Sequence, residues 1–328
     1  MMRQPIALLL ALVVLGSGAC FSGGDELGDM MLRPIAGTVE ILRGNEIIEV
    51  DSDEALEPQD VVVTKADGLA RLNLEDERTV MVQARTRVRI RSPQTIEGQK
   101  GSVLAMADAG SMKVIFDDIT STVSDGIFRL DRGFGSSRAS TYSGSVHLET
   151  PGETRLALDP LHQVEVAAGD LPETAAPYEI DVKDEWDRDY LGEVVDLTVQ
   201  LDLLANGFSN QLGAAPRGLG YFASLVGRDV GFMRPYAARE PADLLVGYTI
   251  ADNDPDRSLA ASFAEALDLH DRGARWGVAA AILDVRTRPL VAQLGDLILG
   301  SGVVASGGGG GGDFTFAAAD APAVAPPD

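Results

Sequence analysis

Short apolar runs alternate with polar residues along the chain from Arg33 to about Gly169. In one of these runs Val88 and Ile90 face one way, while the arginines beside them face the other. A period of two is typical of a β-strand with one buried face. The same pattern predicts strands at 38–42, 61–64, 70–74, 79–83, 87–90, 113–116, 127–130, 138–142, 146–149, 155–158 and 163–166. Many short strands at this spacing predict an all-β sandwich, roll or barrel.

Three small-residue pairs lie between these runs and predict turns. They are Asp67-Gly68, Asp125-Gly126 and Ser143-Gly144. Asp-Gly between alternating runs is the strongest local signal for a β-hairpin, and Ser-Gly is a weaker one. We therefore predict a hairpin at each position.

The period changes beyond two prolines, Pro172 and Pro177, which disfavour both a helix and a central strand. Large apolar residues then recur every three or four positions, which predicts an amphipathic helix of about six turns. They are Trp186, Tyr190, Val194, Leu197, Leu201, Leu204 and Phe208. Asp181 and Asp184 precede this helix and are placed to cap it.

Further helices are predicted at 242–250, 258–271 and 288–299, with Ser258 and Gly273 as end signals of the second. The apolar run 274–283 has no clear period, so both helix and strand remain open there. The predicted fold class is thus an all-β sandwich or roll domain followed by a mostly α-helical domain.

The beginning of the chain reads as a secretion signal. Arg3 precedes an apolar run from Ile6 to Leu15, which is too short to span a bilayer and fits a signal core. Small residues 16–19 follow, and then Cys20, the single cysteine of the chain. This order resembles the lipobox of bacterial lipoproteins. The resemblance implies that Cys20 carries a diacylglyceryl group, which holds the protein on the cell membrane or outer membrane, facing the periplasm or the cell exterior.

We predict the following division of the chain: signal peptide 1–19, tether 20–34, β domain 35–172, linker 173–183, helical domain 184–300, and a disordered Gly/Ala/Pro-rich tail 301–328.

Charge excludes one class of partner. The chain has 27 basic and 50 acidic residues, a formal net charge of −23. Nucleic-acid binding depends on Lys and Arg neutralising phosphates. We therefore expect no nucleic-acid partner.

Three parts of the predicted β domain follow a recognisable order: the opening Gly37-Thr38-Val39, the strand pair around the first Asp-Gly turn, and a closing part. The characteristic residues of the strand pair are Asp60, Val61, Thr64, Asp67, Gly68, Ala70 and Leu72, and those of the closing part are Gly144, Val146, Gln163, Val164, Val166 and Gly169. With these residues in this order, residues 35–172 resemble the FecR domain. FecR proteins are linked to surface signalling, in which a periplasmic domain relays the state of an outer-membrane receptor to a sigma factor through a membrane-spanning segment. We find no apolar run for such a segment after the signal, so a FecR-like domain on a lipoprotein is expected.

No residue pattern predicts a catalytic, cofactor or metal site. His147, His162 and His270 are scattered and have no metal-ligand spacing. The acidic run 252–256 lacks the glycine and glutamate of a calcium loop. The Gly-x-Gly-x-x-Ala run at 218–223 follows no predicted strand, so a dinucleotide site is not predicted.

We therefore predict a lipid-anchored, non-enzymatic envelope protein without a cofactor, whose FecR-like domain binds a protein or glycan partner. Two alternatives stay open: a cell-wall hydrolase, which would need two carboxylates beside the bond, and a purely structural spacer.

Overall fold

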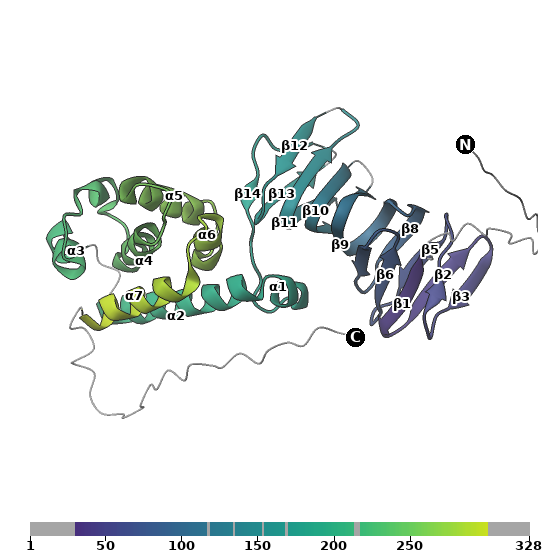
Figure 1. Cartoon of the computed structure of the whole chain (residues 1–328), viewed down its shortest axis with the longest axis horizontal. Helices are drawn as coiled ribbons and strands as arrows, with labels where there is room; N and C mark the ends of the chain where they lie inside the picture. The colour runs from purple at the N-terminus through teal and green to yellow at the C-terminus, as the bar shows by residue number, and fades with distance from the viewer. Residues whose placement is uncertain are drawn as a thin grey trace, which may run out of the picture.

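The computed structural model describes residues 30–300, apart from 117–118, 134, 153, 168–169 and 213–216. It is a mixed α/β protein with a large sheet and several helices, and the strands precede the helices in the chain (Figure 1). The strands are β1 (Met31–Ala36), β2 (Val39–Arg43), β3 (Glu46–Glu49), β4 (Glu54–Ala55), β5 (Val61–Thr64), β6 (Leu69–Leu74), β7 (Arg78–Val82), β8 (Arg87–Ser92), β9 (Thr95–Phe116), β10 (Ile119–Arg132), β11 (Ser136–Glu149), β12 (Arg155–Leu158), β13 (His162–Ala167) and β14 (Ala176–Pro177). The helices are α1 (Glu185–Tyr190), α2 (Gly192–Leu212), α3 (Leu219–Val226), the 3-10 helix η1 (Gly231–Tyr236), α4 (Pro241–Asp252), α5 (Leu259–Asp271), α6 (Trp276–Ile282) and α7 (Thr287–Gly300).

All described strands belong to one hydrogen-bonded sheet that branches at β9. Its main path runs β14-β13-β11-β10-β9-β7-β6-β1-β4, and β12 pairs with β11. The early part of β9 pairs instead with β8, which continues through β5 and β2 to β3. The sheet therefore has two arms, β7-β6-β1-β4 and β8-β5-β2-β3, that both start from β9.

The two arms enclose a common core. Leu32 and Leu72 of the first arm and Ile41 and Val88 of the second are fully buried in the same hydrophobic cluster. These residues alternate with partly or fully exposed ones, as the sequence predicts for strands with one buried face.

The two long strands β10 and β11 correct the prediction of hairpins at Asp125-Gly126 and Ser143-Gly144. Both pairs lie inside a continuous strand, opposite each other, where the register shifts. Asp125 and Gly144 have φ of 47° and 75°. A Cβ on Gly126 would lie 2.2 Å from the carbonyl oxygen of Ser143. The positive φ angles and close backbone contact that these pairs allow form facing β-bulges here, which bend the ribbon without ending it.

The Asp67-Gly68 pair does form a turn, but the predicted hairpin is wrong because β5 and β6 belong to different arms. The turn packs against the corner between β1 and β2. The backbone N–H of Thr38 donates to the Asp67 carboxylate at 3.4 Å, and the N–H of Lys65 donates to the Thr38 carbonyl at 3.0 Å. A Cβ on Gly37 would lie 2.1 Å from the Asp67 carbonyl oxygen. The crossing from β1 to β2 and the crossing from β5 to β6 are therefore fixed on each other.

The helices follow their predicted positions with two differences. The predicted long helix is broken at Leu191 into α1 and α2, and Asp184 caps the first piece by accepting from the N–H of Trp186 at 2.9 Å. The ambiguous run 274–283 forms α6. Ser258 caps α5, and Gly273 follows it with φ of 98°. α3 and η1 were not predicted.

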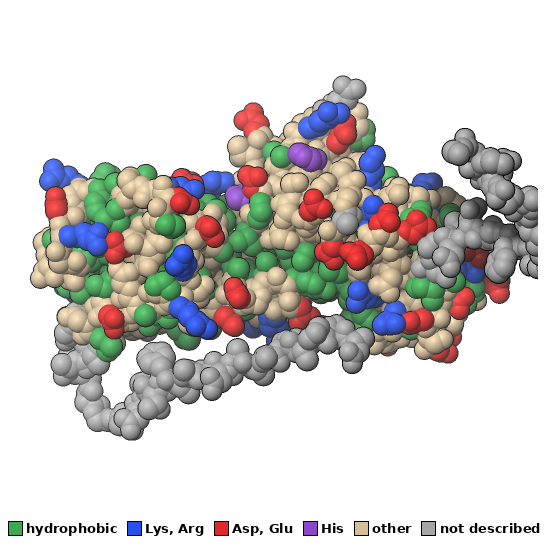
Figure 2. Space-filling model, in the orientation of Figure 1, with side chains coloured by type: hydrophobic (Ala, Val, Ile, Leu, Met, Phe, Trp, Pro, Cys, Tyr) green, Lys and Arg blue, Asp and Glu red, His purple; other side chains and the backbone are tan. Residues whose placement is uncertain are grey.

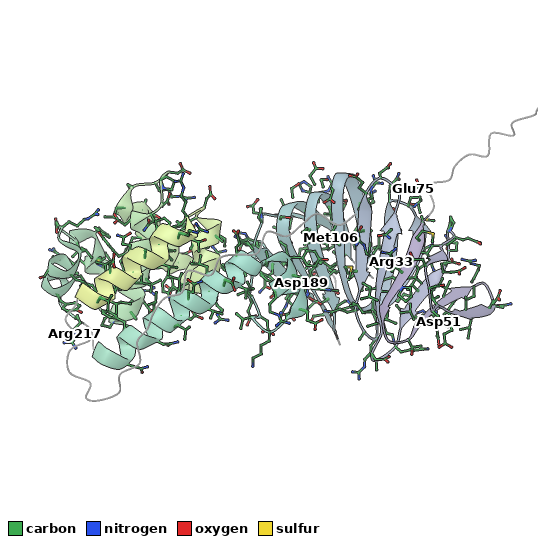
Figure 3. All side chains as sticks on the ribbon, turned by 60° about the horizontal axis from the view of Figure 1, so that its bottom comes forward. Arg33, Asp51, Glu75, Met106, Asp189 and Arg217 are labelled. Atoms are coloured by element: carbon green, nitrogen blue, oxygen red, sulfur yellow. The ribbon has the colours of Figure 1, made fainter. Side chains whose placement is uncertain are left out.

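The molecule is elongated, with the helices at one end of the sheet (Figure 1). Asp51 lies near the sheet end and Arg217 near the helical end, while Met106 and Asp189 lie between them (Figure 3). Acidic and basic side chains are interspersed over the face seen in Figure 2. β1 begins at Met31, inside the predicted tether, and β14 lies inside the predicted linker.

Candidate functional site

A buried polar cluster joins the sheet to the first helix. The Asp187 side chain of α1 is 1% exposed and accepts from the hydroxyls of Tyr142 on β11 and Tyr178, the latter at 2.6 Å. It also accepts from the backbone N–H of Asp181 at 2.7 Å. Each carboxylate oxygen therefore has a donor, as burial of a charged group requires. An acidic residue in a run as polar as 184–189 is normally solvated, so the burial of Asp187 departs from what its sequence neighbourhood indicates.

Arg129 of β10 also belongs to this cluster of Tyr142, Tyr178 and Asp187, which we call the junction cluster. Its guanidinium lies 2.8 Å from the Asp131 carboxylate, 3.1 Å from that of Asp184 and 3.6 Å from that of Asp187. It also lies over the ring of Trp186, 5.2 Å from the centroid, where a cation is attracted to the π face. One strand is thereby connected to three residues of the cap and first turn of α1.

Burial raises the pKa of both tyrosine hydroxyls of the cluster. Burial also raises the pKa of the Asp187 carboxyl, while hydrogen bonds from Tyr142 and Tyr178 act in the opposite direction. Leu104 of β9 and Tyr142 belong to the same hydrophobic cluster as the helices. The junction is therefore a packed interface, and we assign it a structural role.

A solvent-accessible pocket of about 430 Å³ lies among the helices. One wall comes from α2, and the others come from the start of α4, the end of α5 and the turn into α6. The lining residues are Asp202, Ala205, Asn206, Ser209, Glu240, Ala242, Asp243, His270, Gly273, Ala274, Arg275 and Trp276. α6 lies very close to α2 at Gly277, where a Cβ would lie 2.5 Å from the backbone nitrogen of Thr198. Only glycine, which has no side chain, permits this close contact.

Two ion pairs lie at or near this pocket. Arg275 donates to the Asp202 carboxylate through Nε at 3.1 Å and also through Nη2. Arg239 pairs with Asp271. Burial raises the pKa of the Asp243 carboxyl, His270 lowers it, and the negative charge of Glu240 raises it further.

His270 is held on two sides. Its ring stacks on Trp276 with centroids 3.9 Å apart and an angle of 15° between the planes. Its Nδ1 lies 2.9 Å from the Ala274 carbonyl oxygen, and its Nε2 lies 3.9 Å from Oδ1 of Asp243. The imidazole therefore has a fixed orientation in the pocket wall.

The residues that carry the FecR resemblance fix backbone corners. Asp60 is 2% exposed, pairs with Arg43 at 2.7 Å and accepts from the N–H of Glu57 at 2.8 Å. The hydroxyl of Thr64 accepts from the N–H of Thr86 at 3.0 Å. The polar atoms of Asp60 and Thr64 thus bond to other residues of the same chain. Their structural role is sufficient to account for the residue pattern, and no ligand is needed to explain it.

The predicted lipid-attachment residue Cys20 lies outside the described residues. Of the three histidines, His147 is exposed on β11, and His162 bonds the Pro160 carbonyl at 2.9 Å. The structure brings neither of them to the pocket. Only His270 lies in it, which no sequence motif indicates, because the lining comes from separate segments of the chain.

The acidic run 252–256 forms the turn between α4 and α5. Asp254 is 8% exposed and accepts from the N–H groups of Asp256 at 2.9 Å and Arg257 at 3.2 Å. Asp252 accepts from Gln293 at 2.7 Å. The run at 218–223 opens α3, and the element before it is helix α2 rather than a strand.

Two searches of the described part of the chain were negative. None of its helices is long and apolar enough to cross a membrane. It holds no group of three or more His, Cys, Asp or Glu side chains placed to bind a metal ion.

Comparison with known proteins gives few similarities. No protein-family model and no curated protein matches this chain. Two crystal structures of a "putative anti-sigma factor" from Parabacteroides distasonis ATCC 8503 are similar, with 18% and 16% sequence identity and TM-scores of 0.31 and 0.32. Each match covers 36% of this chain and 59% of the other. Similarity at this level establishes no common function, and membership of the FecR family stays a prediction.

Proposed function

We propose that this chain is a lipid-anchored, non-enzymatic binding protein of the bacterial cell envelope. The anchor is a lipid on Cys20, and the pocket among α2, α4, α5 and α6 recognises a protein or glycan partner. Surface signalling is the context that the FecR resemblance implies.

The pocket is the observation that carries the binding role. Its volume of about 430 Å³ lies in the usual range of ligand sites. Its walls combine carboxylates, an amide, a hydroxyl and an aromatic stack, which is the mixture of apolar surface and placed polar groups that recognition uses. Arg275 is held by Asp202, so the polar groups are oriented before a ligand arrives.

The binding proposal is tested by filling the pocket. Ser209→Trp puts a large side chain into the lining, and Asn210→Trp puts the same side chain on an exposed neighbouring position of α2. The two variants and the wild type serve as full-length baits in envelope extracts. We expect a partner that is retained by wild type and Asn210→Trp and lost with Ser209→Trp. Equal capture by all three baits would refute the pocket as the recognition site.

A wall-acting hydrolase is the second candidate, and one observation favours it. Asp243 has a raised pKa, as a general acid needs, and shares the pocket with the carboxylates of Glu240 and Asp202. Release of reducing sugar from wall glycan by wild type, abolished in Asp243→Asn, would establish the hydrolase and overturn the non-enzymatic proposal.

A further inference from the structure

We infer that the pocket binds a cationic nitrogen group, an alkylammonium or guanidinium, between Asp243 and His270. The inference rests on the proposed binding function and names the class of ligand for the same pocket. The group can belong to a free amine or to a basic side chain of a protein partner.

A hydrogen-bond donor of a ligand fits between His270 and Asp243. The Ala274 carbonyl can only accept, so Nδ1 of His270, 2.9 Å away, carries the hydrogen of that bond. In the neutral form of the imidazole the lone pair is therefore on Nε2, which lies 3.9 Å from Oδ1 of Asp243, beyond hydrogen-bond distance. Two acceptors thus face each other. One donor atom can lie about 2.9 Å from both of them, which is the normal N–H···O distance.

The charge of the pocket favours a positive donor. Three lining residues are carboxylates, Asp202, Glu240 and Asp243, and Arg275 is the lining guanidinium. Arg275 is bound by Asp202, and of the two other lining carboxylates Asp243 lies 3.9 Å from His270. Burial raises the pKa of Asp243 most, positive charge on His270 and Arg239 lowers it, and the negative charge of Glu240 raises it, with a raised pKa as the net result. A bound cation would lower this pKa, whereas a bound anion would raise it further.

The walls favour a group on a short apolar stem. Trp276 is 3% exposed and fixes the imidazole plane through the stack, so Nε2 is held in place. The volume of about 430 Å³ exceeds what an ammonium ion needs. Ala205 and Ala242 supply small apolar surface for the carbons behind the charged group.

The test uses the full chain in detergent and follows its imidazole resonances by NMR. The chain has three histidines, so His147 and His162 serve as internal references for His270. N-acetyl-lysine amide is the probe, and N-acetyl-norleucine amide is its uncharged counterpart with the same chain length. We expect the lysine probe to shift the His270 resonance in a saturable manner. The norleucine probe should have no effect.

Two variants test the contact itself. Asp243→Asn should weaken binding of the lysine probe roughly tenfold or more, since it removes a charge-assisted hydrogen bond. Asp189→Asn, on the exposed side of α1, should leave it unchanged. A helical circular dichroism signal and a urea midpoint equal to those of wild type show that the helices of the Asp243 variant are folded, and Glu240→Gln provides a second variant with a smaller expected loss.

The sources of the cation are separated by two further probes. Tighter binding of cadaverine than of the lysine probe assigns the site to free amines, and tighter binding of a lysine-containing peptide assigns it to a protein partner. Equal shifts with both amide probes, or an unchanged affinity in Asp243→Asn, would overturn the inference. If Ser209→Trp still abolished capture in that case, the binding function would stand and only the ligand class would fail.

Discussion

Replacing Asp187 with alanine should destabilise the protein strongly, although the residue is one of many acidic residues on a helix. Its carboxylate accepts from two tyrosine hydroxyls and from the backbone of Asp181. Truncation leaves these donors without their acceptor. The hydroxyls of Tyr142 and Tyr178 are 3.2 Å apart and can bond each other, so about two of the three donors stay unsatisfied.

The magnitude follows from this count. A buried donor without a partner costs about 1–3 kcal/mol, so two of them give an expected loss in the free energy of unfolding of about 2–6 kcal/mol. Arg129 keeps Asp131 and Asp184 as partners, so no buried charge is left alone and the loss stays within this range. Whole domains are stable by about 5–15 kcal/mol, so the change is large.

Urea unfolding of the full chain, followed by circular dichroism, measures this loss. Asp189→Ala is the matched control, since it is the same substitution at an exposed position of the same helix, where about 0.5 kcal/mol or less is expected. Tyr178→Phe should lie between them, at about 1 kcal/mol, because it removes one hydrogen bond and leaves the others. If Asp187→Ala and Asp189→Ala were equally stable, the junction cluster would not hold α1 on the sheet.

Three other predictions concern substitutions of single residues. Gly98→Ala should destabilise the sheet by about 1–3 kcal/mol, because its Cβ would lie 1.9 Å from the Phe116 ring, and Phe116→Leu in the same chain should restore part of the loss in urea titrations. Burial alone would raise the pKa of Asp254, but hydrogen bonds from neighbouring groups lower it overall. The contribution of ionised Asp254 to the free energy of unfolding is therefore complete above the unfolded pKa of about 3.9, and it is lost as the pH falls through the lower folded pKa. The stability difference between wild type and Asp254→Asn should accordingly narrow below about pH 4, and a constant difference from pH 6 to pH 3 would contradict this. Cys20→Ser should move the protein from the membrane to the soluble fraction and abolish labelling by a fatty-acid analogue, and unchanged fractionation would refute the anchor.

Strand positions could be predicted because alternation is a local property, whereas strand length could not. Asp125-Gly126 and Ser143-Gly144 provide positive φ angles and close approach. These properties suit both a hairpin and a bulge, and the choice depends on whether the partner strand continues on the other side. In β10 and β11 each pair faces the other, so the two strands continue together.

The helical stripe was predicted correctly in its apolar positions, but Asp187 was not. An acidic residue in a polar run is normally solvated. Here its burial depends on Tyr142 and Tyr178, whose hydroxyls arrive from outside the helix. The pocket could not be predicted for a similar reason, since Asp202, Asp243 and His270 come from three helices and share no spacing. Such sites are defined by packing between elements rather than by order along the chain.

The continuous sheet and the junction cluster together set the reach of the helical end above a membrane. If Cys20 carries the lipid, ten peptide links separate the bilayer surface from Met30, and at most about 3.6 Å per residue limits this span to about 36 Å. Beyond Met30 the strands form one hydrogen-bonded body, and α1 is clamped to it by Asp187 and Arg129. The pocket can therefore move relative to the membrane only when the whole molecule moves about the predicted tether.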